Sequence, residues 1–404
     1  MTDNITVNNV PTSAVGGGAD FSSNGEQVPQ VIKRWDDLDL KESLLRGIYA
    51  YGFENPSEIQ KKAIPAILTG RDTIGQAQSG CGKTGTFAIG LLQRLDITSQ
   101  TTQTLILVPT HELVHQIATV IRALGSFMDG LEVRTMVGGT SVREEIDSIT
   151  KCVPHVVVGC TGRVLDMIHR RALNACDIKM LIMDEADEML SHGFKDQVYE
   201  IFQQLNMEIQ VALFSATMPP EILELAEKFM RDPIQITMKA VELNLECIKQ
   251  YYVALASDDA KFDMLKTIFE KITISQCIIY VNTVPRVVDL YDALVRDGFP
   301  VCCIHSSMDK AERDRVMTDF RKGTYRMMIS SNLTARGIDV QQVGTVINFD
   351  IPSDVHSYLH RIGRSGRWGR KGKAINFMVR QDVRQMRRIE EHYGSTVEEL
   401  PQEF

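Results

Sequence analysis

The chain has 404 residues, 44% of them apolar and 24% charged, which is typical of a globular protein with two ordinary domains. Its formal net charge of −8 excludes a bulk polycation that coats nucleic acid, but not a local basic patch. The eight cysteines have no metal-binding spacing, and no apolar run is long enough to span a membrane. We therefore expect a monomeric intracellular protein with reduced thiols and no membrane segment.

The order of polar and apolar segments predicts the domain organisation. Residues 1–33 are rich in Asn, Ser, Thr and Gly, a composition that indicates a disordered tail. From residue 34 onward, short apolar runs alternate with helical stretches, which predicts parallel sheets covered by helices. The clearest runs are 104–108, 155–158, 180–183, 277–281, 327–330 and 345–348. We predict an α/β fold with one domain at 34–238, a short polar linker at 239–247 and a second domain at 248–404.

A loop of small residues at 77–84 follows the short apolar run 72–76 and precedes a stretch with helical spacing. Such a loop lets backbone N–H groups surround a polyphosphate, and the following helix points its positive end at the anion. Lys83 would reach the β- and γ-phosphates, and the Thr84 hydroxyl would ligate Mg²⁺. The residues that would cradle the phosphates are Ser79, Gly80, Cys81 and Gly82. A glycine-rich turn before a core helix is the alternative, because residue 77 is Ala where the pattern normally has Gly.

An acidic segment follows the apolar run 180–183 directly. In a protein with a phosphate-binding loop, acids at the end of a buried strand form the second half of the metal site. Asp184 would hold Mg²⁺ through its hydration shell, and Glu185 would orient and deprotonate the attacking water. A solvated turn is the alternative interpretation of these acids alone. Together, the two motifs predict an enzyme that hydrolyses ATP with Mg²⁺.

The tetrapeptide Asp-Glu-Ala-Asp at 184–187, with further motifs in the same order, resembles the DEAD-box ATP-dependent RNA helicases over residues 35–401. This resemblance implies two RecA-like domains that close on single-stranded RNA, with ATP in the cleft between them. It also implies that RNA is held through phosphates and 2′-hydroxyls with little sequence readout.

The resemblance assigns further residues to ATP. In the segment 52–60, the Gln60 amide would pair with adenine and Phe53 would stack on it, with Trp35 as an upstream aromatic or simply a core residue. Gly337 and Asp339 would hold the ribose. Arg364 and Arg367 would neutralise charge on the γ-phosphate when the domains close, so the implied catalytic residues are Lys83, Glu185, Arg364 and Arg367.

Two more groups follow from the same resemblance. Residues of the first group would couple the state of ATP to RNA opening: Asp187, Ser215, Thr217 and His360. Those of the second group would contact RNA: His111, Gly139, Gly162, Arg163, Thr283 and Ser331.

Departures from the family pattern gather on the RNA side. His111 stands where the family has Arg, and Cys160-Thr161 replaces Thr-Pro. The segment 283–286 lacks two basic residues, Asn332 replaces an Asp, and Lys310 replaces a Gln. We therefore expect complete ATP chemistry and an altered grip on RNA.

The stretches 43–53 and 228–233 resemble the branch of the family that acts in translation initiation with a scaffold partner. A nuclear exon-junction helicase is the second alternative, so the implied location is cytoplasmic with a nuclear alternative. From a different functional class, an ATP-gated RNA clamp or competitor subunit with weak unwinding remains open. A double-stranded DNA motor is disfavoured, because the acidic chain lacks accessory DNA-binding modules.

Overall fold

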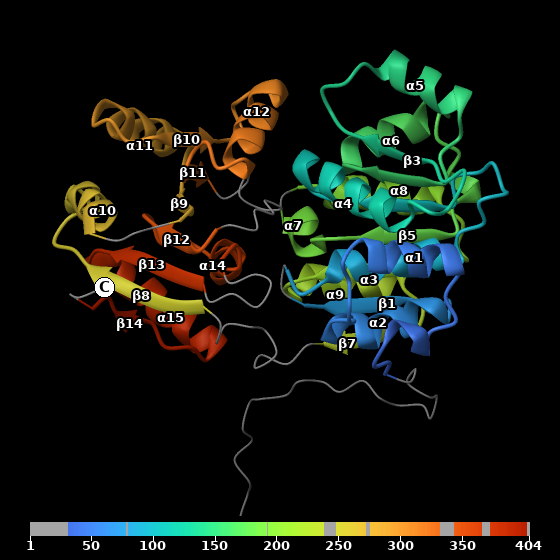
Figure 1. Ribbon diagram of the computed structural model, residues 1–404, viewed down its shortest axis with the longest axis horizontal. Helices are drawn as coiled ribbons and strands as arrows, with labels where there is room; N and C mark the ends of the chain where they lie inside the picture. The colour runs from blue at the N-terminus through green and yellow to red at the C-terminus, as the bar shows by residue number, and fades with distance from the viewer. Residues whose placement is uncertain are drawn as a thin grey trace, which may run out of the picture.

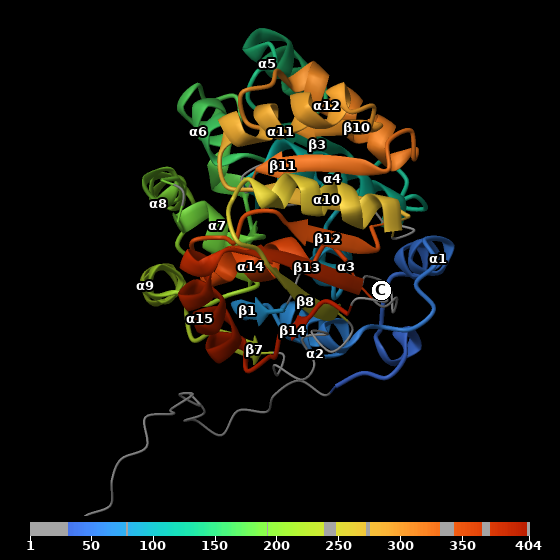
Figure 2. The same cartoon turned by 90° about the vertical axis from the view of Figure 1, so that its left-hand side faces the viewer.

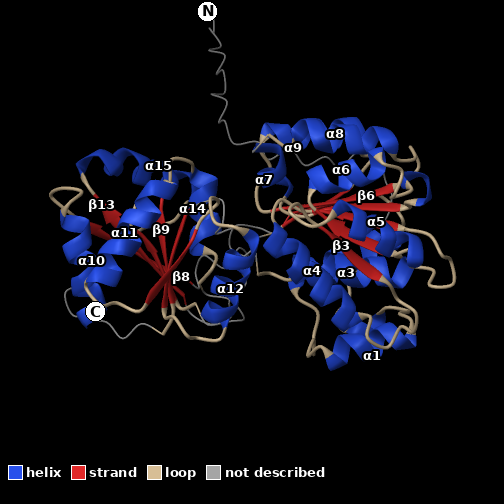
Figure 3. Cartoon of the chain, turned by 90° about the horizontal axis from the view of Figure 1, so that it is seen from above, coloured by secondary structure: helices blue, strands red, loops and turns tan. Residues whose placement is uncertain are grey.

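The computed structural model describes residues 31–77, 80–191, 193–237, 248–271, 275–331, 343–365 and 372–401. These residues form two parallel sheets of seven strands, and helices lie on both faces of each sheet (Figures 1 and 3). The prediction of an α/β fold with two helix-covered parallel sheets is confirmed.

The first sheet has the strand order β3-β4-β2-β5-β6-β1-β7. Its strands are β1 (Thr73–Gln76), β2 (Thr104–Leu107), β3 (Val133–Met136), β4 (Val156–Gly159), β5 (Met180–Met183), β6 (Gln210–Ser215) and β7 (Ile234–Thr237). Its helices are α1 (Glu42–Ala50), α2 (Glu58–Leu68), α3 (Lys83–Arg94), α4 (His111–Leu124), α5 (Val142–Lys151), α6 (Thr161–His169), α7 (Ala186–Ser191), α8 (Lys195–Gln204) and α9 (Pro220–Phe229).

The second sheet has the order β10-β11-β9-β12-β13-β8-β14 and lies in front of the first in Figure 2. Its strands are β8 (Ile248–Ala254), β9 (Cys277–Val281), β10 (Val301–Ile304), β11 (Met327–Ser331), β12 (Thr345–Asn348), β13 (Gly372–Met378) and β14 (Glu398–Glu399). Its helices are α10 (Ala260–Lys271), α11 (Val284–Arg296), α12 (Lys310–Arg321), α14 (Val355–Ile362) and α15 (Val383–Tyr393).

Consecutive residues of the central strands are buried on opposite faces of the sheet. In β2, Leu105 packs with residues of α6, α8 and α9, whereas Ile106 packs with residues of α1 to α4. Strands buried on both faces are near-continuous apolar runs, which is why the sequence reveals β2, β4, β5 and β9. Ile32, inside the expected tail, is only 6% exposed, and its N–H donates to the Lys61 carbonyl at 3.2 Å. The packed part of the first domain therefore includes this residue.

The strand order places three loops side by side. Strands β5, β6 and β1 are neighbours in the first sheet, and all run parallel. The segments after them carry the acidic cluster, Thr217 and the phosphate loop, respectively. Because carboxyl ends of parallel strands meet at one edge, these loops converge where ligands of open α/β sheets bind.

Candidate active site

The phosphate loop packs closely against α2, and two glycines permit this approach. Gly82, the residue before α3, has a φ of 102°, and a Cβ there would lie 2.8 Å from the Ser57 Oγ. A Cβ at Gly85 would lie 2.6 Å from the Gln60 Nε2. Residues with a side chain would therefore push the start of α3 away from α2.

The start of α2 is tied to the same loop by hydrogen bonds. Gln60 and Ser57 form a capping box, in which the Gln60 Oε1 accepts from the Ser57 N–H at 2.7 Å. The Ser57 hydroxyl donates to the Cys81 carbonyl at 2.9 Å, and the Gln60 Nε2 donates to the Gly82 carbonyl at 3.4 Å. An amide offers two lone pairs and two N–H donors, so Gln60 retains one of each for the edge of a purine.

An aromatic pair supports the segment before α2. The Trp35 ring is fully buried, and its indole N–H donates to the Phe53 carbonyl at 2.9 Å. The Phe53 ring lies edge-on to Tyr51, with centroids 4.8 Å apart. Trp35 is thus a core residue that also supports the backbone of Phe53.

The acidic segment after β5 is buried beside the phosphate-loop lysine. The Lys83 Nζ lies 3.5 Å from the Glu185 Oε1, and both side chains are almost fully buried. Glu185 has a left-handed backbone with a φ of 51°, which is uncommon for a residue with a side chain and is concentrated at functional sites. Burial raises the pKa of Asp184 to about 7, although Lys83 acts in the opposite direction. Burial also raises the pKa of Glu185, but Lys83 and His360 outweigh it and leave that pKa lowered.

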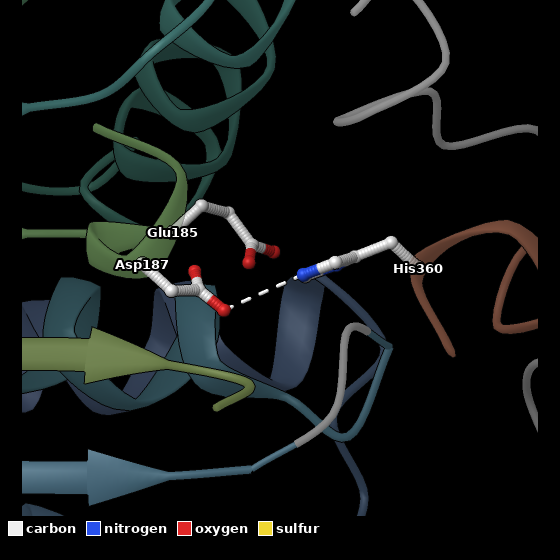
Figure 4. Close-up of side chains that lie close together, drawn as sticks. All are labelled: Glu185, Asp187 and His360. Carbon is white, nitrogen blue, oxygen red and sulfur yellow. Dashed lines mark ion pairs between the residues drawn. The ribbon is translucent and has the colours of Figure 1, made fainter. Parts of the chain in front are cut away.

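A side chain from the second domain completes this cluster. The His360 Nε2 lies 3.4 Å from the Asp187 Oδ2, across the boundary between the domains (Figure 4). The same oxygen accepts from the Thr217 hydroxyl at 2.6 Å, and the Ser215 hydroxyl accepts from the Asp187 N–H at 3.3 Å. Burial of Asp187 is outweighed by its hydrogen bonds to His360 and Thr217, which hold its pKa below the usual range.

A cavity of about 240 Å³ lies between the phosphate loop, α2 and the acidic segment. Arg364 of the second domain reaches into its lining, is 3% exposed, and donates from Nε to the His360 carbonyl at 2.9 Å. The predicted ATP-side residues that line it are Phe53, Gln60, Gly80, Cys81, Gly82, Lys83, Thr84, Asp184, Glu185 and Arg364. Ser79, Gly337, Asp339 and Arg367 lie outside the described residues.

The predicted RNA residues are spread over both domains. Gly139 and Gly162 are exposed, and Gly139 has a φ of 79° with open space where a Cβ would stand. His111 is the first residue of α4 and is half-buried beside Gly138. Thr283, before α11, is exposed, whereas Ser331, at the end of β11, is only 5% exposed.

Arg163, which is predicted to contact RNA, forms several contacts within the first domain. Its guanidinium forms an ion pair with Glu145, and the Arg163 side chain is 8% exposed. It also donates to the Thr140 hydroxyl at 2.7 Å and to the Thr140 carbonyl at 3.0 Å. Because these contacts occupy the charged head, Arg163 supports the loop that carries Gly139.

Sequence reasoning missed several contacts around the site. Thr161, where the family has Pro, donates its hydroxyl to the Gln197 Oε1 at 2.7 Å. Glu112 of α4 and Arg313 of α12 form an ion pair of 3.6 Å between the domains. Long-range ion pairs leave no local sequence signal. The contact of Thr161 has one, because a Thr in place of Pro adds a hydroxyl that can donate a hydrogen bond. No helix within the described residues combines the length and apolar character needed to cross a membrane.

Comparison with known proteins agrees with this geometry. A sequence model described as "DEAD/DEAH box helicase" matches residues 57–225, and one described as "Helicase conserved C-terminal domain" matches residues 260–369. Eukaryotic initiation factor 4A of Caenorhabditis elegans is 49% identical over 373 residues, 92% of each chain. 

Solved structures show the same architecture. The structure of S. cerevisiae Dbp5 bound to RNA and ADP BeF3 matches with a TM-score of 0.86 and 34% identity, covering 92% of this chain and 96% of that one. A DEAD box protein from the hyperthermophile Methanococcus jannaschii matches with a TM-score of 0.55 and 34% identity, covering 92% and 100%. The two-domain RecA-like fold is thus confirmed, and the chain belongs to the DEAD-box family of ATP-dependent RNA helicases.

Proposed function

We propose that the chain hydrolyses ATP in the cavity between its domains and uses domain closure to bind and locally unwind RNA during translation initiation. The observation that carries this proposal is the position of two side chains of the second domain. His360 and Arg364 lie beside the buried acidic residues of the first domain. A site that is complete only when the domains meet makes hydrolysis depend on closure.

Lys83 and Arg364 would stabilise negative charge that develops on the transferred phosphoryl group. Glu185 would accept the proton of the attacking water, because its carboxylate lines the phosphate end of the cavity. When ATP binds, Lys83 would turn to the phosphates and its ion pair with Glu185 would break. Glu185 would then be available to act on water. Phe53 and Gln60 would hold the adenine at the other end of the cavity.

The residues at the phosphate end suit Mg²⁺. Thr84 and Asp184 both line the cavity, and hydroxyl and carboxylate oxygens are the ligands that Mg²⁺ prefers. A bound Mg²⁺ would supply positive charge beside the β- and γ-phosphates.

Asp187 would carry the state of the site to the RNA side. It accepts from Thr217 of the first domain and lies beside His360 of the second, so separation of the domains breaks one of its contacts. The RNA itself would be single-stranded and held with little sequence preference. The relative Dbp5 has been solved bound to RNA. The relation to initiation factor 4A favours a cytoplasmic monomer that works with a scaffold protein.

An ATP-gated clamp with weak unwinding is a second candidate, and one observation favours it. Arg286 is the basic residue left in the segment 283–286, and it pairs with Asp258 at 2.7 Å and Asp350 at 2.8 Å. These ion pairs hold the Arg286 charge within the second domain, which weakens the expected grip on RNA.

One experiment separates the two candidates. ATP hydrolysis is measured with and without single-stranded RNA, beside displacement of a short strand from an RNA duplex. A helicase shows RNA-stimulated turnover with strand displacement, whereas a clamp retains ATP-dependent RNA binding with little displacement. Turnover that ignores RNA, in a protein that also fails to bind it, contradicts both candidates.

A further inference from the structure

The boundary between the domains brings together three metal-ligating side chains. Glu185, Asp187 and His360 each present one ligand atom, these atoms lie within 4.8 Å of one another, and all three residues are buried. Figure 4 shows the two carboxylates of the first domain facing the imidazole of the second. We propose that they form a site for a transition-metal dication of the Zn²⁺ class, which fastens the domains together without nucleotide.

The kinds of ligand select the class of metal. One imidazole nitrogen and two carboxylate oxygens, with water in the fourth position, resemble the three-ligand open sites that bind Zn²⁺. Mg²⁺ prefers oxygen ligands in an octahedral arrangement and is a poor match to imidazole. The site therefore differs from the Mg²⁺ position proposed at Thr84 and Asp184.

The spacing of two ligand atoms already matches a tetrahedral ion. At bond lengths of about 2.0–2.2 Å, tetrahedral ligands stand roughly 3.3–3.6 Å apart. The Asp187 Oδ2 and the His360 Nε2 are 3.4 Å apart, so the ion can take the place of the hydrogen bond between them. The third ligand, Glu185, needs only a rotation of its flexible side chain.

Contacts behind the ligands hold Asp187 in one orientation. The Thr217 hydroxyl donates to its Oδ2 at 2.6 Å, and the Glu188 N–H donates to its Oδ1 at 3.0 Å. Carboxylates that bind metals are usually hydrogen-bonded in this way, and such outer-shell donors fix the ligand and tune the affinity of the site.

Charged groups near the proposed site both favour and oppose binding of the metal ion. The carboxylates of Glu185 and Asp187 balance a dication, whereas the Lys83 ammonium, 3.5 Å from Glu185, repels it. A metal held by Glu185 would also remove the proposed base from the attacking water. The ion would thus act as an inhibitory clamp on the closed form rather than as a cofactor of hydrolysis.

Co²⁺ is a suitable probe because it occupies zinc sites and absorbs visible light when tetrahedral. The full chain, free of nucleotide and Mg²⁺, is titrated with Co²⁺ while the absorption and the radius of gyration by X-ray scattering are recorded. We expect a one-to-one tetrahedral spectrum and a smaller radius of gyration. In His360→Asn the affinity should fall more than about 100-fold, because losing even an outer-shell partner costs about 10–100-fold.

His356→Asn is the matched control, since His356 lies one turn earlier on α14 and its ring faces His392 with centroids 5.4 Å apart. This variant should retain the spectrum and the affinity. A spectrum lost in His356→Asn but kept in His360→Asn places the metal at the other histidine pair and overturns the proposal, as does a wild-type protein with no tetrahedral spectrum. Glu185→Gln provides a second variant in case His360→Asn does not fold. Neither readout involves ATP hydrolysis, so failure here is distinct from failure of the proposed function.

Discussion

Arg163 and Glu145 form an ion pair that holds two helices of the first domain together and withdraws the arginine from solvent. We predict that Glu145→Gln strengthens RNA binding by up to about tenfold, which corresponds to 1.4 kcal/mol, because it frees the guanidinium to meet a phosphate. The salt dependence of binding should steepen by about 0.7 in log–log slope for one added contact to a single strand. Fluorescence anisotropy with labelled RNA at several salt concentrations measures both effects.

Glu144→Gln is the control for this prediction. Glu144 lies beside Glu145 in the first turn of α5 and is exposed, so its substitution removes the same charge without releasing Arg163. Equal salt slopes for the two variants would show that Arg163 stays a support of the Gly139 loop.

Glu185→Gln should lower ATP turnover by about 10²–10⁴-fold, the usual contribution of a positioned base. Affinity for ATP and RNA should change little, because the amide keeps the size of the side chain. Single-turnover hydrolysis, together with equilibrium binding of a fluorescent ATP analogue, separates the two effects. Turnover close to that of wild type would remove Glu185 from the mechanism.

Cys81 should be the cysteine whose alkylation abolishes ATP binding, and bound ATP should protect it. It is half-buried, lines the cavity and lies two residues before Lys83. Burial raises the pKa of Cys302 to about 12 and that of Cys303 to about 11, and raises that of Cys277 as well, so these thiols should react slowly. Mass spectrometry after timed maleimide treatment ranks the sites.

Cys81→Thr, which replaces the thiol with a hydroxyl that maleimide does not alkylate, should keep ATP binding intact under the same treatment. If wild type and variant lose ATP binding at equal rates, another residue is responsible.

His111→Arg should strengthen RNA binding by about tenfold at high pH, since one charge-assisted hydrogen bond contributes about 1.5–3 kcal/mol. Wild-type affinity should improve as pH falls from about 8 to 6, because only the protonated imidazole carries a positive charge. The arginine variant should show a flat profile over this range. Parallel pH profiles with equal affinities would mean that His111 does not meet RNA.

Stability should fall in acid partly because of His356. Burial lowers the pKa of His356 below its ordinary 6.5, and the neighbouring His392 adds to this, while Asp354 and Asp187 oppose it. Because the pKa of His356 is lower in the folded protein, the unfolded chain binds the proton more readily. The contribution of neutral His356 to the free energy of unfolding is therefore complete above about pH 6.5 and is lost as the pH falls below it. Thermal unfolding of His356→Gln should therefore depend less on pH between about 7 and 5 than wild type.

His115→Gln, which removes an exposed histidine of the first domain, should leave that pH dependence unchanged. A His356→Gln profile that parallels wild type would assign the acid sensitivity to other groups.

Much of the fold was readable because its central strands are buried on both faces. The runs that became β2, β5, β9 and β12 are buried at every residue, are mostly apolar, and follow loops of small or polar residues. Edge strands carry weaker signals. In β3 only the two end residues are buried, and β14 consists of two exposed glutamates paired to β8, so neither pattern can be distinguished from a loop.

Most residues predicted for ATP line one cavity, and each belongs to a short local motif, so the sequence was enough to group them. The contacts that adjust the site could not be predicted, since they join residues far apart in sequence. Glu145 lies 18 residues from Arg163, and Glu112 meets Arg313 only after both domains have folded. A guanidinium in a motif looks the same in sequence whether it faces RNA or a carboxylate, so the ion pair of Arg163 with Glu145 could not be predicted.

The buried indole of Trp35 determines where a truncated form of the first domain can begin. The region matched by the helicase model begins at residue 57. Trp35 and Phe53 lie before it, yet they pack in the same hydrophobic cluster as residues of α2 and α3. A fragment that starts at the match would expose apolar surface on α2 and α3 and lose the aromatic side of the nucleotide cavity. The packed part of the first domain therefore extends upstream of the residues that the helicase model matches, at least to Ile32.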